Sequence, residues 1–288
     1  MSRTFVSEHA STYPVTRLCA LVEVARSSFY EWASRPLSDH DVDDAWLAND
    51  VFDIHVASRC TYGSPRVAGQ LRNRGRRHGR KRIARIMAEC GLVGVHGRKK
   101  WRRGKRDTAP AGDLLERDFT AERSNQRWVA DITEFHCVDG KLYLAGIKDL
   151  CDQGLAGWSM GERQTTDLVV SALVMALARR VPDGDLLHHA DHGSQYTSLE
   201  FTNRLRDWNV DASYGTVGDC FDNAAMESTW ATLKKEIRHI WGPWEKLTRS
   251  QLRTILFEYI EVFYNRERHQ ARLDHRTPAE TYASSRAA

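Results

Sequence analysis

The sequence lacks the features that would place the chain in a membrane, outside the cell or around a structural zinc ion. No apolar run approaches the roughly 18 residues that a membrane-spanning helix needs, and the first ten residues hold no apolar segment typical of a signal peptide. No C-x-x-C pair occurs among the scattered cysteines, which are Cys19, Cys60, Cys90, Cys137, Cys151 and Cys220. We therefore expect neither a disulfide framework nor a cysteine zinc site, and we expect the protein to work in a reducing cytoplasm, away from membranes.

Acidic residues are almost absent from one part of the 288-residue chain. Between Arg59 and Arg106 the sequence has 17 lysine and arginine residues and a single acidic residue, Glu89. Residues 107–288 carry 21 basic and 28 acidic residues, a net charge of −7, while the whole chain is at +4. A basic block beside a mildly acidic region predicts a polyanion that the first binds and the second acts on. The alternative is a solvated basic tail, but the apolar spacing within the block favours a folded DNA-binding module.

Residues 1–57 are predicted to form an N-terminal helical segment. Apolar residues recur at helical intervals over 14–24, and Ser27 or Ser28 can cap a second helix. Two short helices about a tight turn are compatible with a helix-turn-helix, as they are with any other two-helix unit. A further amphipathic helix is predicted over residues 38–53.

Residues 58–97, called the basic subdomain below, are predicted to form a helical DNA-binding subdomain. Helices are expected over 65–74 and 79–90, with Pro65 in the first turn of the former and a glycine after each. Each helix has an apolar face, and the remaining surface is cationic and exposed. Such a surface contacts phosphates without specifying sequence. The expected DNA contacts here are Arg66, Arg72, Arg80, Lys81, Arg82 and Arg85.

Residues 98–112 show no apolar periodicity and are predicted to be a basic linker at the domain boundary. Trp101 within it is equally compatible with stacking on a base and with local packing. The linker residues expected to contact DNA are Lys99, Lys100, Arg102 and Arg103.

Residues 113–245 are predicted to form a mixed α/β domain, because three strands come first and helices then alternate with strands. The expected strands cover 127–137, 141–147, 154–160, a segment ending at 190, and 210–214; the expected helices cover 166–180, 199–208 and 223–238. The turn between the first two strands is assigned to Asp139-Gly140. Asp149 and Asp152 are candidates for the site or, more commonly, for turns. Residues 246–288 are predicted to form a helical tail with an amphipathic helix over 250–263.

Three carboxylates in this domain are predicted to converge. Asp131 lies on the first strand, Asp191 directly follows the fourth, and Glu227 lies on a helix after 35 intervening residues. Two strand ends and one helix can meet at one spot, and three carboxylates without a cysteine or histidine cage suit a hard divalent cation such as Mg²⁺. His188 and His192 have the spacing of a zinc pair but would not share a helical face, so zinc is disfavoured.

The motifs around these carboxylates resemble those of the OrfB transposases of the IS-three family of bacterial insertion sequences. The three catalytic motifs are Trp128-Val129-Ala130-Asp131-Ile132-Thr133, Asp191-His192-Gly193-Ser194-Gln195-Tyr196 and Phe221-Asp222-Asn223-Ala224-Ala225-Met226-Glu227-Ser228. Other similar stretches are Leu18-Cys19 through Tyr30-Glu31-Trp32, Tyr62-Gly63-Ser64-Pro65-Arg66-Val67, Leu233-Lys234-Lys235-Glu236, Tyr264-Asn265 and Thr277-Pro278-Ala279-Glu280. The sequence departs from the family at His192, where arginine is usual, and at His269, which stands one place early.

The resemblance implies a DDE enzyme with an RNase H-like catalytic core, a mixed five-stranded sheet with flanking helices, related to retroviral integrase. It implies that Asp131, Asp191 and Glu227 are catalytic and hold two Mg²⁺ or Mn²⁺ ions, one activating a water or a DNA 3′-hydroxyl and the other stabilising the leaving oxygen. The same site would cleave the 3′ end of the element and join it to another strand. Lys234, about two turns beyond Glu227, and His192 are expected to contact DNA.

The implied partner is double-stranded DNA, both element ends and target, bound by a homo-oligomer in the bacterial cytoplasm at the nucleoid. In the family an upstream frame, OrfA, usually supplies a helix-turn-helix and a leucine zipper by frameshift fusion. This chain has no sustained heptad run, which favours such a partner or fusion. Two alternatives remain: an RNase H-like nuclease that cuts without joining, and a catalytically inactive DNA-binding regulator. The intact acidic triad argues against the regulator.

Overall fold

The computed structural model describes residues 2–34, 38–95, 121–182, 184–191, 193–214 and 224–287. The chain divides into two compact units, Met1–Asp50 and Val51–Ala288. The predicted linker over 98–112, its four DNA-contact candidates and His192 lie outside the described residues. Within the described ranges, no helix is both long enough and apolar enough to cross a membrane.

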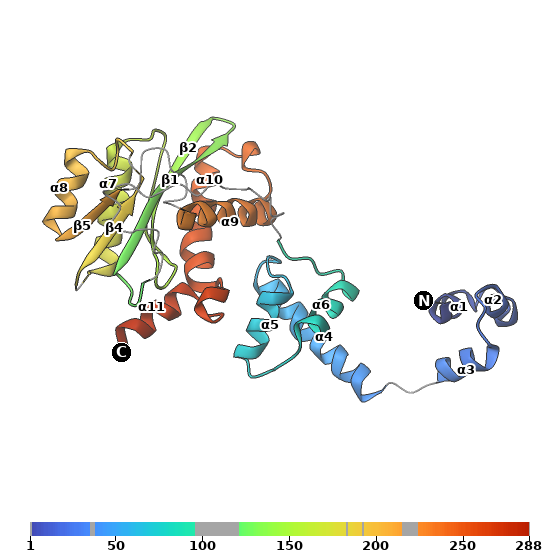
Figure 1. Ribbon diagram of the computed structural model, residues 1–288. Coiled ribbons are helices and arrows are strands. Elements are labelled where there is room, and N and C mark those ends of the chain that lie inside the picture. Colours follow the sequence, from blue (N-terminus) through green and yellow to red (C-terminus); the bar gives the residue numbers. More distant parts are fainter. Residues whose placement is uncertain are drawn as a thin grey trace, which may run out of the picture. The chain divides into compact units, whose positions relative to one another are not determined.

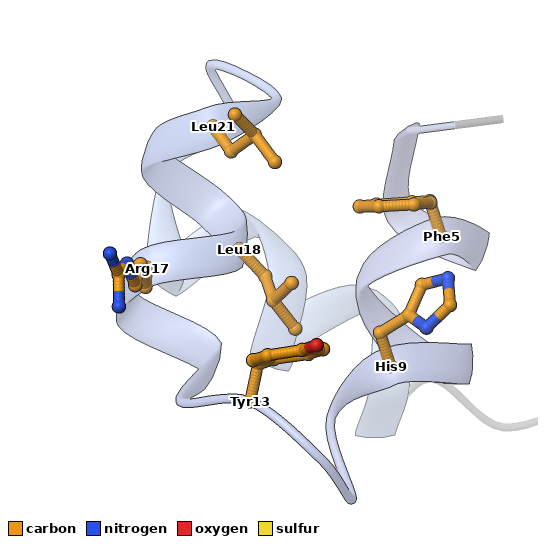
Figure 2. Close-up of a pocket in the computed structure, with 6 residues that line it drawn as sticks. All are labelled: Phe5, His9, Tyr13, Arg17, Leu18 and Leu21. Atoms are coloured by element: carbon orange, nitrogen blue, oxygen red, sulfur yellow. The ribbon is translucent and has the colours of Figure 1, made fainter.

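The first unit is helical. It contains α1 (Ser2–His9), α2 (Val15–Leu21), α3 (Arg26–Ser34) and the start of α4 (Asp39–Ala57). Its small apolar cluster consists of Val6, Leu18, Cys19 and Phe29. The helices expected over 14–24 and after Ser27 are present, whereas α1 was not anticipated, because Val6 is the one residue that this helix buries. A pocket of about 690 Å³ lies between α1 and α2, with Phe5 and Leu18 among its lining residues (Figure 2).

The basic subdomain contains α5 (Ser64–Asn73) and α6 (Arg80–Glu89). Pro65 stands in the first turn of α5, as predicted. The apolar faces are those expected from the spacing, since the buried residues include Val67 and Leu71 on α5 and Ile83 and Ile86 on α6.

A five-stranded mixed sheet forms the centre of the second unit. Its strands are β1 (Arg127–Cys137), β2 (Gly140–Asp149), β3 (Leu155–Gly161), β4 (Leu186–Ala190) and β5 (Val210–Tyr214), in the spatial order β3-β2-β1-β4-β5. The first three strands form an antiparallel meander, and β4 and β5 run parallel to β1. This confirms the predicted mixed sheet, with strand bounds within two residues of those expected.

Helices cover both faces of this sheet (Figure 1). α7 (Thr166–Arg180) and α8 (Leu199–Asp207) pack on one face, while α9 (Ala224–Trp241) and α10 (Arg249–Phe257) pack on the other. Alternate residues of β1 supply the two cores: Trp128 faces the first pair of helices and Val129 the second, as the period of two in a strand requires. Gly157 lets α7 approach, because a Cβ there would lie 2.3 Å from the backbone oxygen of Ala172.

The C-terminal segment differs from the single amphipathic helix predicted over 250–263. α10 ends at Phe257, and the chain continues as a π-helical segment, η2 (Glu258–Glu267), then through η3 (Ala271–Leu273) to α11 (Pro278–Ala287). Two tyrosines of η2 donate hydrogen bonds to distant groups, Tyr259 to Glu236 and Tyr264 to the backbone oxygen of Gln153. The spacing of apolar residues predicts which side of this segment is buried. It does not predict these long-range hydrogen bonds or the π-helical geometry.

Candidate active site

Asp131 and Asp191 follow the last paired residues of two adjacent parallel strands. β1 and β4 pair from Arg127 with Leu187 to Ala130 with Ala190. Neighbouring strands lie about 4.8 Å apart, so the backbones that carry the two carboxylates are close at this edge of the pairing. Beyond it β1 continues against β2, whereas β4 ends. Asp191 thus directly follows the end of β4, as predicted, whereas Asp131 lies within β1, one residue beyond its last partner on β4.

The carboxylate of Asp131 is partly buried and held by two donors. Its Oδ1 accepts from the backbone N–H of Ile132 at 2.8 Å, and its Oδ2 accepts from Trp230 Nε1 at 3.0 Å. Burial, helped by the negative charges of Asp191 and Glu227, raises the pKa of Asp131 to about 6, although the two hydrogen bonds oppose the shift. The three predicted carboxylates thus act on one another electrostatically.

Helix α9 carries Glu227 in its first turn, where the side chain is exposed. Trp230, three residues later, is 5% exposed and packs on β2 at Gly146, the register partner of Asp131. A Cβ on Gly146 would lie 2.5 Å from Trp230 Cη2, so this close approach requires glycine. Trp230 therefore anchors the N-terminal half of α9 to the strand that carries Asp131.

A second anchor lies beside the first, where the buried Lys148 Nζ donates to Thr229 Oγ1 at 2.8 Å. The sequence alone did not indicate a role for Trp230, Gly146 or Lys148 at this site. The available signal was the spacing of Glu227 and Trp230, since residues three apart share a helical face.

The stretch after β4 folds close to the strand ends. Tyr196 is 3% exposed; burial, Asp131 and Asp191 all raise the pKa of its phenol. Its backbone N–H donates to Gly193 O at 3.1 Å, and Ser198 then caps α8. His188 is buried beneath this stretch, and burial lowers its pKa to about 3, so it is a neutral core side chain.

The donor set fits a hard divalent cation, although the site is not closed around one. All three groups are carboxylates, and their mutual repulsion at Asp131 is what a bound cation would relieve. Among the residues that the structure describes, no three carboxylate, histidine or cysteine side chains lie close enough to share an ion.

Asp149 and Asp152 form a turn. Asp149 Oδ1 accepts from the backbone N–H groups of Cys151 and Asp152, and Asp149 Oδ2 accepts from Trp128 Nε1 at 3.1 Å. Asp152 is ion-paired with Arg180 at 2.6 Å. These bonds support the interpretation of Asp149 and Asp152 as turn residues. Asp149 is paired with Trp128, three residues from Asp131 along β1.

The predicted cationic contacts fall into different environments. Arg72 and Arg80 are exposed and line a pocket of about 540 Å³ together with Arg77 and His78. Lys81 is exposed, Arg82 is partly buried, and Arg85 forms an ion pair with Glu89 on its own helix. Lys234 is partly buried, with its Nζ 5.0 Å from the centre of the Phe135 ring, and burial lowers its pKa.

Arg66 differs from its prediction as an exposed residue. Its side chain is 29% exposed and pairs with the buried Glu236 at 3.4 Å. The helical spacing of α5 places it beside the cationic face, but a partner 170 residues later in the chain draws it inward.

Two family models match separate stretches of this chain. The model of an integrase core domain matches residues 121–220, and that of an HTH-like domain matches residues 41–100. The fold and this match define an integrase-core protein with a mixed five-stranded sheet and flanking helices.

Relatives extend this likeness over nearly the whole length. The transposase InsF of insertion sequence IS3A from Escherichia coli (strain K12) is 34% identical, covering 93% of each chain, and the transposase of insertion sequence element IS629 from Shigella sonnei is 35% identical, covering 93% of this chain and 91% of that one. A 31 kDa protein of insertion element IS600 from Shigella sonnei is 36% identical over 91% of this chain and 96% of its own. The chain belongs to this IS-three family of insertion-sequence transposases.

Solved structures are more distant. The catalytic core domain of HTLV-2 integrase in complex with magnesium is 16% identical, with a TM-score of 0.43, covering 56% of this chain and 98% of that one. A chain of the simian T-cell lymphotropic virus intasome in complex with PP2A regulatory subunit B56 gamma is also 16% identical, with a TM-score of 0.49, covering 80% of this chain and 73% of that one.

Proposed function

We propose that this transposase cleaves DNA to free a 3′ end and then joins that end to a second strand, with Asp131, Asp191 and Glu227 as its catalytic residues. The single observation that carries the proposal is the position of Asp131 and Asp191 directly after the last paired residues of two adjacent parallel strands, with Asp191 and Glu227 both within electrostatic range of Asp131. These carboxylates would hold two divalent cations, Mg²⁺ or Mn²⁺, which would activate a water or the DNA 3′-hydroxyl and stabilise the leaving oxygen.

The chain's own residues position and charge this site. Ile132 N–H and Trp230 Nε1 fix the two oxygens of Asp131 and favour its ionised form. Trp230 and Thr229 hold α9, the helix that carries Glu227, against β1 and β2. Lys234, on the same helix, stands where it would meet a phosphate near Asp131, and His192 remains a predicted DNA contact.

DNA would reach the site through the basic subdomain. Exposed Arg72 and Arg80, together with Lys81, present a cationic surface for backbone phosphates, which gives affinity without sequence information. The predicted linker residues Lys99, Lys100, Arg102 and Arg103 would extend it. A homo-oligomer on the DNA and an upstream-frame OrfA partner remain predictions.

Replacing Asp191 by Asn tests the proposal on a labelled duplex that carries the end of the encoding element, with Mg²⁺. We expect wild type to give 3′-end cleavage and joined product, and Asp191→Asn to lose both while binding the duplex with near-normal affinity. Asp211→Asn, an exposed aspartate on β5 of the same sheet, is the matched control and should keep full activity. Strand transfer by Asp191→Asn would refute the assignment; cleavage without joining, or binding alone, by wild type would favour the nuclease or the regulator.

A further inference from the structure

A buried carboxylate on α9, that of Glu236, joins three parts of the second unit. Its oxygens accept from Arg268 at 2.8 and 2.9 Å, from the hydroxyl of Tyr259 at 2.7 Å and from Arg66 Nη1 at 3.4 Å. Arg268 follows η2, whereas Arg66 lies on α5 of the basic subdomain. The Arg268 and Glu236 side chains are 4% and 3% exposed, so the cluster is closed to solvent on the side of η2.

Further contacts seat the basic subdomain on the same C-terminal segment. The hydroxyl of Tyr62 accepts from the backbone N–H of His269 at 2.6 Å, and Asn73 Nδ2 donates to the backbone oxygen of His275 at 2.9 Å. Gly69 lies directly against the His275 ring, where a Cβ would come within 2.1 Å. The contacts run from the start of α5 to its end. The C-terminal segment therefore forms a continuous packing surface for α5, called its seat below.

The two arginines at this contact, which is called the joint below, bind Glu236 with unequal strength. Burial alone would raise the pKa of Glu236, but Arg268 and then Arg66 reverse the effect and lower it. Arg268 binds the carboxylate with two short hydrogen bonds, while Arg66 adds one longer bond from a side chain that is 29% exposed. The Arg66 bond is therefore the part that can be removed without breaking the buried pair within the core.

We propose that Arg66 and Glu236 are positioning residues, which fix the basic subdomain to the helix that carries Glu227 and so set the register in which bound DNA meets the carboxylates. Glu236 lies nine residues beyond Glu227 on α9, roughly 13 Å along one rigid helix. The inference rests on the proposed function, because it assigns a purpose to the joint only if the carboxylates cut DNA. In this arrangement Arg66 does not contact phosphate, unlike Arg72 on the same helix.

Arg66→Met and Arg72→Met in the full chain separate the two roles. Both remove one positive charge from α5, but only the first reaches Glu236. Affinity for a duplex of arbitrary sequence is measured at several salt concentrations, and 3′ cleavage of the element-end duplex is followed at nucleotide resolution. Arg66→Met should keep its affinity within about twofold and its salt dependence unchanged, yet cleave about tenfold to a hundredfold more slowly and at scattered positions. Arg72→Met should lose about one unit of salt slope and cut at the normal position.

Two further variants test whether Arg66 acts through its contact with Glu236. Arg66→Lys, which keeps the charge, should restore part of the cleavage accuracy. Adding Arg66→Met to Glu236→Gln should change cleavage no further than Glu236→Gln alone, because both act through one contact. The proposal is overturned if Arg66→Met loses affinity and salt slope as Arg72→Met does, or if it cuts at the wild-type rate and position.

Failure of the proposed function would look different, since wild type itself would then not cleave. The joint is still testable by hydrogen exchange, because Arg66→Met should speed amide exchange in α5 and around His269 and His275, where Arg72→Met should not. Equal exchange in the two variants would overturn the joint whatever the outcome for catalysis.

Discussion

Gly146→Ala tests whether the contact between α9 and β2 sets the active site. The added Cβ would lie 2.5 Å from Trp230 Cη2 and 3.5 Å from Leu155 Cδ2, so a rigid indole must move by about 1 Å to reach ordinary van der Waals contact. Trp230 is 5% exposed and its N–H is bound to Asp131, so it cannot swing into solvent. Either the hydrogen bond breaks or the first turn of α9 shifts, and Glu227 shifts with it.

The expected magnitudes follow from these alternatives. Overpacking of this kind destabilises by about 1–3 kcal/mol, which lowers Tm by several degrees in a unit of this size. A displacement of about 1 Å at a catalytic group lowers the rate by up to about a hundredfold. Thermal unfolding followed by circular dichroism and single-turnover cleavage of the element-end duplex measure the two effects.

Trp230→Phe supplies the matched control, because phenylalanine lacks the outer indole ring that meets the new Cβ. The double variant should unfold at a higher temperature than the sum of the two single effects predicts. A wild-type Tm together with a wild-type cleavage rate for Gly146→Ala would refute the reasoning, as would strictly additive losses in the double variant.

Three other outcomes are expected. Burial raises the pKa of Asp131 from 3.8 to about 6, so its proton stabilises the fold fully below pH 3.8 and this contribution is lost as the pH rises through 6. Asp131→Asn should therefore melt higher than wild type at pH 8 but not at pH 3.5 without metal; an equal difference at both pH values would contradict this. Asp152→Asn breaks the buried pair with Arg180 and should destabilise by about 3–5 kcal/mol in urea unfolding, and a loss below about 1 kcal/mol would exclude the pair as a major contribution. Arg72→Ala with Arg80→Ala should reduce the salt slope of DNA binding by about two, and an unchanged slope would remove both from the phosphate contacts.

The elements that could be predicted are those whose burial follows a simple period. The helix of residues 166–180 and the strand of residues 210–214 coincide with their predicted bounds, because apolar residues repeat at the right interval and a capping or turn residue ends each one. Asp131 could be placed on a strand and Asp191 directly after one for the same reason. The parallel pairing that brings their backbones close was not predicted and comes from the fold.

The parts that escaped prediction depend on which surface an element meets. Spacing marks Trp230 as buried but does not name Asp131 and Gly146 as its neighbours. Likewise the sequence of α5 places Arg66 among exposed arginines, and only the fold reveals Glu236 beside it. Such pairs join residues about a hundred or more positions apart, where local periodicity carries no information.

The seat of α5 also bears on how the chain acquires its structure during synthesis. Arg59 and Tyr62 are made 199 and 207 residues before Glu258 and His269, to which they bind. Because translation proceeds from the N-terminus, the basic subdomain leaves the ribosome long before its seat exists. The geometry that would link binding to cutting is completed only when η2 and the residues after it have folded.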